Sequence, residues 1–159
     1  MPTLALDLDG TLIAEVTPFA SGHEPRGWVA RLGAFESLRL GTRQLVLEAR
    51  RRGWRVVVYT TSMRSPLSVR ATFLAHGLWL DGVINGQRHR DEEQRQRASW
   101  PVKYPPAFGV ELLVDDSLSL EQQGRAMGFR VVWVQVTQTD WVTRVLRRMD
   151  ATGSVEGAS

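Results

Sequence analysis

The chain has 159 residues, a length that suits a single folded domain. Hydrophobic residues make up 43% and charged residues 23%, so the chain can bury a core and is not disordered as a whole. The absence of cysteine excludes a disulfide framework and a thiolate metal site. No signal peptide opens the sequence and no apolar run could span a bilayer, so we expect a cytoplasmic protein with no membrane partner.

The basic residues are almost all arginine, yet the formal net charge is only +3. Arginines cluster at residues 50–52 and between residues 88 and 97, and each cluster is either a solvated helix face or a patch that binds a polyanion. Lys103 is the only lysine. This position is therefore expected to need a compact, flexible ammonium group and not a planar guanidinium group.

Along the chain, apolar and β-branched runs alternate with segments of helical period. The runs predict buried strands at residues 3–8, 55–59, 80–84, 110–114 and 130–136. Helices are expected over residues 42–52, from Ser65-Pro66 to Gly77, near residues 91–98, from a capping box of Ser119 and Gln122 to Gly128, and after Asp140. This order predicts an α/β fold, a doubly wound, Rossmann-like parallel sheet with helices on both faces and its ligand site at the carboxyl ends of the strands.

Two longer segments interrupt the alternation, and each is either structural filler or a contributor to substrate contact. Residues 13–40 could form a short flap over the strand ends, and residues 85–102 are rich in Arg, Gln and Glu. Both are too short to be domains. We expect one domain over residues 1–150 and a disordered tail over residues 151–159.

Polar residues that can carry chemistry follow three of the expected strands. They are Asp7 and Asp9 after the first strand, Thr60 and Thr61 after the second, and Asp115 and Asp116 after the fourth, with Lys103 just upstream of the fourth. Charged groups at the ends of buried strands are costly unless they are paired, solvated or bound to a metal. Several acids with one cation indicate a hard divalent cation, and for a phosphate substrate this is Mg²⁺.

Each of these segments also has an ordinary structural explanation. Asp9-Gly10 alone marks a turn, and Asp115-Asp116-Ser117 alone could cap the next helix. The segments lie far apart in the sequence, however, and the predicted sheet brings them to one edge. That convergence favours a functional site.

At this point the sequence resembles the haloacid dehalogenase-like (HAD) hydrolases. Leu4–Thr11 reads LALDLDGT, similar to the family's first motif, an apolar strand followed by Asp-x-Asp-Gly-Thr. Val56–Thr60 resembles the second motif, Lys103 the third, and Leu112–Asp116 the fourth, an apolar strand that ends in paired acids. All four occur in the family's order, and the resemblance extends over residues 3 to about 136.

The resemblance implies a phosphatase that works through an aspartyl-phosphate. Asp7 would attack phosphorus, and Asp9 would protonate the leaving group and then activate water. Thr60 and the backbone of Thr61 would hold the phosphoryl oxygens, and Lys103 would neutralise both the phosphate and the nucleophile. A carboxylate can attack a phosphoryl dianion only when both charges are screened, so the chemistry agrees with this set of residues.

The resemblance also implies where Mg²⁺ would bind. Its ligands would be Asp7, the backbone carbonyl of Asp9, and the acid pair, with Asp116 as the direct ligand and Asp115 in support. Gly10 would allow the sharp turn after Asp9.

The chain departs from many relatives because neither interruption is long enough to be a cap domain. A capless or minimally capped site leaves the substrate open, either a small phosphorylated molecule or a phosphorylated polynucleotide end, and is compatible with a homo-oligomer. Two other classes remain as alternatives. One is a catalytically silent binding module on the same fold, and the other is a phospho-acceptor, receiver-like signalling domain, in which the acid pair would instead end the first strand.

Overall fold

A parallel sheet of five strands forms the centre of the molecule. The computed structural model describes residues 1–14, 21–23 and 36–156. In spatial order the strands are β5 (Gly82–Ile84), β4 (Arg55–Tyr59), β1 (Thr3–Leu6), β6 (Leu112–Asp115) and β7 (Val131–Trp133). Leu6 at the end of β1 lies beside Val58 of β4 and Val114 of β6. This register aligns the carboxyl ends of the three central strands.

The chain changes direction across the sheet at β1. It passes from β1 outward through β4 to β5, and then returns to the other side of β1 to form β6 and β7. Ligands of open parallel sheets bind at such switch points, outside the carboxyl ends of the strands. The fold therefore predicts a ligand site at the carboxyl ends of β1, β4 and β6.

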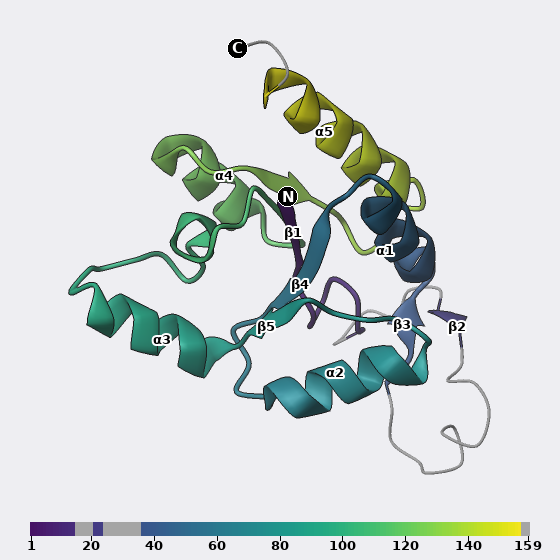
Figure 1. Ribbon diagram of the computed structural model, residues 1–159, viewed down its shortest axis with the longest axis horizontal. Coiled ribbons are helices and arrows are strands. Elements are labelled where there is room, and N and C mark those ends of the chain that lie inside the picture. Colours follow the sequence, from purple (N-terminus) through teal and green to yellow (C-terminus); the bar gives the residue numbers. More distant parts are fainter. Residues whose placement is uncertain (15–20, 24–35, 157–159) are drawn as a thin grey trace.

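Helices cover both faces of the sheet (Figure 1). One face carries α1 (Thr42–Arg51), α2 (Pro66–Ala75) and α5 (Trp141–Glu156). The other carries α3 (Gly86–Arg95), the short helix η2 (Pro105–Phe108) and α4 (Leu118–Met127). The predicted doubly wound α/β fold is confirmed.

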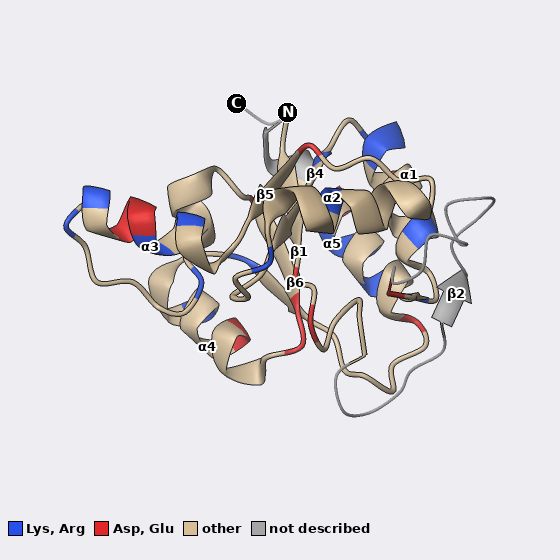
Figure 2. Ribbon diagram, turned by 90° about the horizontal axis from the view of Figure 1, so that it is seen from below, with Lys and Arg blue, Asp and Glu red and all other residues tan. Residues whose placement is uncertain are grey.

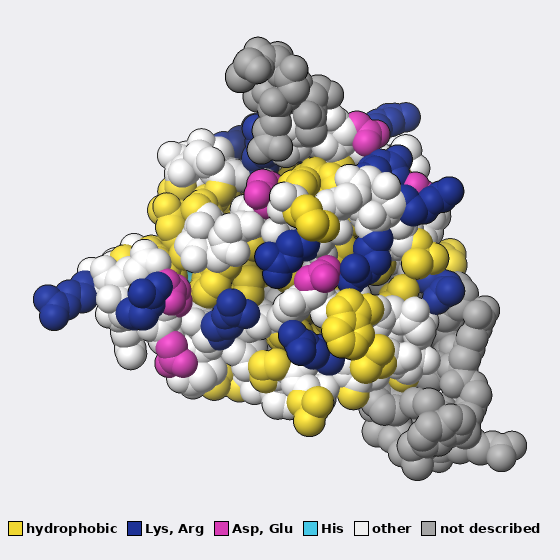
Figure 3. All heavy atoms as spheres, viewed as in Figure 1, with side chains coloured by type: hydrophobic (Ala, Val, Ile, Leu, Met, Phe, Trp, Pro, Cys, Tyr) yellow, Lys and Arg dark blue, Asp and Glu magenta, His cyan; other side chains and the backbone are white. Residues whose placement is uncertain are grey.

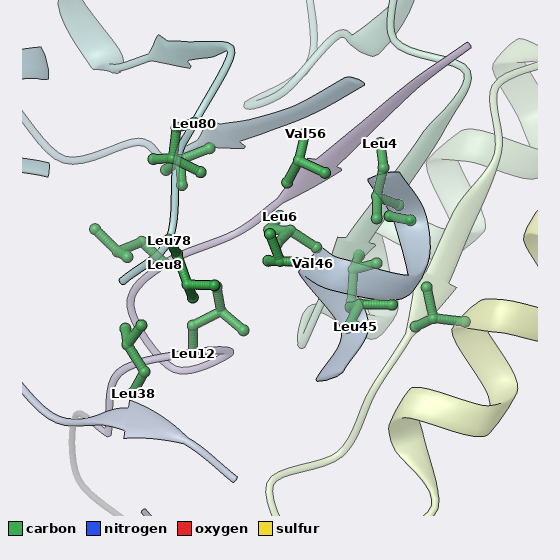
Figure 4. Packing of buried hydrophobic residues seen from close by; sticks show 14 of the residues in the cluster. Leu4, Leu6, Leu8, Leu12, Leu38, Leu45, Val46, Val56, Leu78 and Leu80 are labelled. Carbon is green, nitrogen blue, oxygen red and sulfur yellow. The ribbon is translucent and has the colours of Figure 1, made fainter. Parts of the chain in front are cut away.

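Alternating side chains of β1 supply both halves of the core. Leu4 and Leu6 pack with Leu45 and Val46 of α1 (Figure 4), whereas Ala5 belongs to the cluster on the opposite face. All of these side chains are fully buried. Burial on both faces explains why the strand sequences are continuously apolar and not alternating.

Two helices begin earlier than the sequence predicted. Ser117 is the N-cap of α4 and accepts a hydrogen bond from the Leu120 backbone N–H at 3.3 Å, so the capping box placed at Ser119 is wrong. The α3 helix begins directly after Asn85, whose side chain accepts a hydrogen bond from the Arg88 N–H at 3.0 Å. Local side-chain caps determine both starts.

The chain end differs from expectation as well. The α5 helix continues to Glu156, past the expected start of a tail at residue 151, and residues 157–159 lie outside the described residues. Within the described part of the chain, no helix is both long and apolar enough to cross a membrane.

The segment expected to form a flap contains a small antiparallel sheet of β2 (Ser21–His23) and β3 (Leu38–Arg39). Residues 15–20 and 24–35 of that segment lie outside the described residues. The buried Arg39 guanidinium donates hydrogen bonds to the carbonyl oxygens of Gln135 at 2.7 Å and Gln138 at 2.9 Å. These bonds attach β3 to the loop before α5.

Candidate active site

A cavity of about 390 Å³ opens at the carboxyl ends of the central strands. Figure 2 shows acidic residues in red where β1 and β6 end. All seven residues singled out from the sequence line this cavity: Asp7, Asp9, Thr60, Thr61, Lys103, Asp115 and Asp116. The structure therefore brings together segments that are separated by up to about a hundred residues of chain.

Lys103 joins two of the carboxylates. Its ammonium group donates hydrogen bonds to Asp7 Oδ1 at 2.5 Å and to Asp115 Oδ2 at 2.6 Å, and all three side chains are nearly inaccessible to solvent. The same ammonium lies 5.8 Å from the centre of the Tyr59 ring. A compact ammonium with three donors suits this position between two oxygens, whereas a planar guanidinium group does not.

Burial and neighbouring charges together determine the pKa values of Asp7 and Lys103. Removal from water raises the pKa of the Asp7 carboxyl to about 6, although the charge of Lys103 opposes the shift, and the Asp115 charge adds to it. Burial would lower the pKa of Lys103, but the two carboxylates outweigh it and the net shift is upward. The Lys103 ammonium therefore stays charged. Burial destabilises the ionised form of the Asp7 carboxyl group, and a further cation would stabilise that form.

Thr11 links Asp7 to the second acid of the pair. Its hydroxyl lies 2.8 Å from Asp7 Oδ2 and 3.2 Å from Asp116 Oδ1, and its single hydrogen cannot serve both oxygens fully. Asp115 is held differently, because its Oδ1 accepts the Ser117 backbone N–H at 2.9 Å while Lys103 occupies Oδ2. Asp116 is therefore the acid of the pair with more freedom to bind a ligand.

The carboxylates fit a divalent cation. Asp7, Asp115 and Asp116 each offer one oxygen, and these oxygens lie within 4.8 Å of one another. All the donors are oxygens, the kind that Mg²⁺ prefers, and the acids outnumber the cations beside them. The Asp9 carboxylate is not in this group of described residues, since it is directed to Arg64 instead.

Arg64 contacts the site residue Asp9, and Glu36 contacts Arg64; neither residue was predicted from the sequence. Arg64 Nη2 donates to Asp9 Oδ1 at 3.0 Å, and the same guanidinium group forms an ion pair with Glu36. Arg64 is in the loop that follows β4, and Glu36 lies just before β3. Neither residue belongs to a motif or a periodic pattern, so only the fold reveals the pair.

The loop after β4 brings hydroxyl and backbone groups to the cavity. The buried Thr60 accepts a hydrogen bond from the Ser62 N–H at 3.1 Å, and its Oγ1 lies 3.5 Å from Asp9 Oδ2. Thr61 is exposed at the cavity wall. The loop thus faces the acids across the cavity, where an anionic group could be held.

A polar network of Tyr59, His89 and the Tyr104 backbone holds the segment that carries Lys103. The Tyr59 hydroxyl accepts the Tyr104 backbone N–H at 2.9 Å and lies 2.6 Å from His89 Nδ1. The Tyr59 hydroxyl and His89 Nδ1 share a hydrogen bond whose donor depends on the His89 tautomer. This network orders the backbone next to Lys103.

Sequence comparison gives no relative, whereas comparison of structures gives a similar fold. No protein-family model matches the chain, and no curated protein matches it. A chain in a solved structure of the Pnkp1/Rnl/Hen1 RNA repair complex matches with a TM-score of 0.51 at 16% identity, over 84% of this chain and 42% of that one. A second structure of the Pnkp1/Rnl/Hen1 complex gives a TM-score of 0.53 at 14% identity, over 87% of this chain and 47% of that one. The protein therefore spans less than half the length of these neighbours, and at such identities the likeness concerns the fold alone.

Proposed function

We propose that the protein is a Mg²⁺-dependent phosphomonoesterase of the HAD-like type, which works through an aspartyl-phosphate on Asp7. The observation that carries this proposal is the buried Lys103 ammonium, which bridges Asp7 and Asp115 at the base of a cavity at the sheet's switch point. A buried cation beside an acid nucleophile screens the charge of an approaching phosphate. The likeness in fold to chains of an RNA repair complex is compatible with phosphoester chemistry.

In the first half-reaction a carboxylate oxygen of Asp7 attacks phosphorus, and the bond from phosphorus to the leaving oxygen breaks. Asp9 gives its proton to that oxygen. Water then attacks phosphorus, Asp9 takes the proton of the water, and the bond from phosphorus to Asp7 breaks to release phosphate. Two observations support this role for Asp9: it lines the same cavity as Asp7, and it forms a hydrogen bond with Arg64.

Asp7 and Asp116, supported by Asp115, would hold Mg²⁺, which would supply charge neutralisation to the phosphoryl group. Thr60 and the backbone after it would bind the phosphoryl oxygens opposite Lys103. The cavity is open, so both a small phosphomonoester and a phosphorylated polynucleotide end remain as substrate classes. Most of the catalysis would come from position and electrostatics.

The test is phosphate release from para-nitrophenyl phosphate in Mg²⁺ and in EDTA. The parent should turn over only in Mg²⁺, and Asp7→Asn should not turn over because a neutral amide is a poor nucleophile. Asp91→Asn provides the control, since Asp91 is an exposed acid on α3. Turnover by Asp7→Asn would refute the proposal. A parent that binds Mg²⁺ without turnover would be a silent binding module, and one that keeps a stable phosphoryl group from acetyl phosphate would be receiver-like.

A further inference from the structure

A groove rich in arginine lies beside β7, the edge strand of the sheet, between α4 and α5. Two adjoining cavities of about 520 and 260 Å³ form this β7 groove and share several lining residues. Its arginines are Arg125 from α4, Arg130 from the turn before β7, and Arg144, Arg147 and Arg148 from α5. All five are exposed.

Most arginines of the β7 groove have no acidic partner among the described residues. Arg125 is paired with Glu121, but the other four form no ion pair with any carboxylate of the described residues. On α1, by contrast, Arg51 and Arg52 both bind Glu48. On the face that Figure 3 shows, Lys and Arg side chains lie scattered with Asp and Glu side chains among them. The β7 groove therefore concentrates unbalanced positive charge.

Helical spacing explains this concentration. Arg144, Arg147 and Arg148 follow the i, i+3, i+4 pattern that places side chains on one face of a helix, and Ala151 continues that face with a small side chain that leaves room. The opposite face of α5 holds buried apolar residues such as Val145. The three arginines of α5 therefore lie together on its exposed face, opposite the face that packs on the core.

The β7 groove begins next to the candidate active site. Leu118 lines the groove and comes directly after Asp116-Ser117, which line the catalytic cavity. Trp133 at the end of β7 also lines the groove, and its indole N–H donates to the Asp116 carbonyl oxygen at 3.0 Å. A chain molecule with one end in the cavity could therefore continue along β7.

We propose that the β7 groove binds the phosphodiester backbone of a single-stranded polynucleotide whose phosphorylated end lies in the catalytic cavity. This inference rests on the proposed function for the position of that end. Guanidinium groups bind phosphate oxygens in a bidentate manner, and the half-buried Trp133 ring offers a surface on which a base can stack. A peptide strand added to β7 fits less well, because β7 has only three residues.

The test measures binding directly and needs no turnover. A fluorescein-labelled single strand of about 12 nucleotides with a terminal phosphate is titrated with protein in EDTA, and fluorescence anisotropy gives the affinity. Arg144→Gln/Arg148→Gln should bind about tenfold more weakly at low salt, and its plot of log affinity against log salt should be shallower by about 1.4. The control Arg55→Gln/Arg97→Gln removes two exposed arginines that also form no ion pair within the described residues but do not line the groove, and it should bind like the parent.

Two outcomes overturn the proposal. One is equal binding by the groove variant and the control variant. The other is an acidic peptide that binds the parent as tightly as the oligonucleotide and loses affinity in the same groove variant, which assigns the surface to a protein partner. A parent with no activity on para-nitrophenyl phosphate refutes the proposed function alone, since the binding measurement still decides what the groove holds.

Discussion

Arg64 Nη2 lies 3.0 Å from Asp9 Oδ1, and the same guanidinium group holds Glu36. The candidate acid and base is therefore oriented by a cation from the neighbouring loop, and that cation is tied in turn to the segment before β3. The Arg64 side chain is 36% exposed, whereas the Asp7 side chain is nearly inaccessible to solvent.

We expect Arg64→Gln to impair proton transfer more than nucleophilic attack, because Asp9 loses the group that orients it. The kcat for an alkyl phosphate, whose leaving group needs a proton, should fall about tenfold more than the kcat for para-nitrophenyl phosphate. Glu36→Gln is the matched control, since it leaves the pair of Arg64 and Asp9 in place, and it should show a smaller difference. Equal losses for the two substrates in Arg64→Gln would assign Arg64 to binding and not to the position of Asp9.

Gly10 makes the close approach of Asp116 to the first strand possible. Its φ is +80°, and a Cβ there would lie 2.7 Å from Asp116 Oδ2. Gly10→Ala should therefore lose about 1 to 2 kcal/mol of stability to backbone strain and should also weaken Mg²⁺ binding by displacing that carboxylate. Urea unfolding and calorimetric titration of Mg²⁺ measure the two effects.

Gly53 offers a control with the same backbone strain. Its φ is +75°, and among the described residues no heavy atom beyond its chain neighbours lies within 4 Å of the place where its Cβ would be. Gly53→Ala should lose comparable stability but keep the Mg²⁺ affinity of the parent. If both variants bind Mg²⁺ equally well, Asp116 does not need the space that Gly10 leaves.

The sequence was sufficient for the parts of the site that follow from strand order. Asp7, Thr60 and Asp115 each come directly after or at the end of an apolar strand, and parallel strands in a doubly wound sheet bring such positions to one edge. Lys103 was recognisable as the only lysine and by its place between two of the expected strands. These features depend on topology, which apolar patterning reveals.

The remaining parts depend on contacts that no local pattern encodes. Arg64 reaches Asp9 and Glu36 across loops whose paths the sequence does not specify. The true start of α4 was missed because Ser117 and Ser119 are both good capping residues, and only the end of β6 decides between them. Side-chain reach and competition between neighbouring caps are therefore what limited the prediction.

Burial of Asp7 should make the stability of the metal-free protein depend on pH. The pKa of Asp7 is raised to about 6 in the folded state from 3.8 for the ordinary carboxyl group, so between these values the folded protein holds a proton that the unfolded chain has released. Stability should accordingly fall as pH rises through this window, by on the order of 2 to 3 kcal/mol. Urea unfolding in EDTA at about pH 4 and pH 6.5, with Asp7→Asn beside the parent, isolates the contribution of Asp7.

The quantity to compare is the difference in unfolding free energy between the parent and Asp7→Asn. It should decrease with rising pH for this pair. The same difference measured between the parent and Asp91→Asn, which removes an exposed acid on α3, is the control. Mg²⁺ should abolish the decrease, because a bound cation stabilises the ionised carboxylate. A difference that does not change with pH would mean that Asp7 ionises in the folded protein as it does in the unfolded chain.

The last prediction separates Asp7 from Asp9 by the step that each serves. Asp9→Asn loses the general acid and the general base together, and proton transfer is worth roughly 10² to 10⁴ in rate for each step that it assists. An aryl oxide leaves without much protonation, so transfer of the phosphoryl group to Asp7 should survive better than attack by water. The phosphoenzyme should therefore accumulate in this variant.

Rapid mixing of Asp9→Asn with para-nitrophenyl phosphate should give a burst of at most one phenolate per chain, followed by slow turnover. Intact-mass measurement during the slow phase should find one added phosphoryl group, and the double variant Asp7→Asn/Asp9→Asn should show neither the burst nor the added mass. The double variant is the decisive control, because a burst that persists without Asp7 must arise on another nucleophile. Parent-like turnover by Asp9→Asn would instead show that the proton comes from elsewhere, in which case the ion pair of Asp9 and Arg64 is a structural contact.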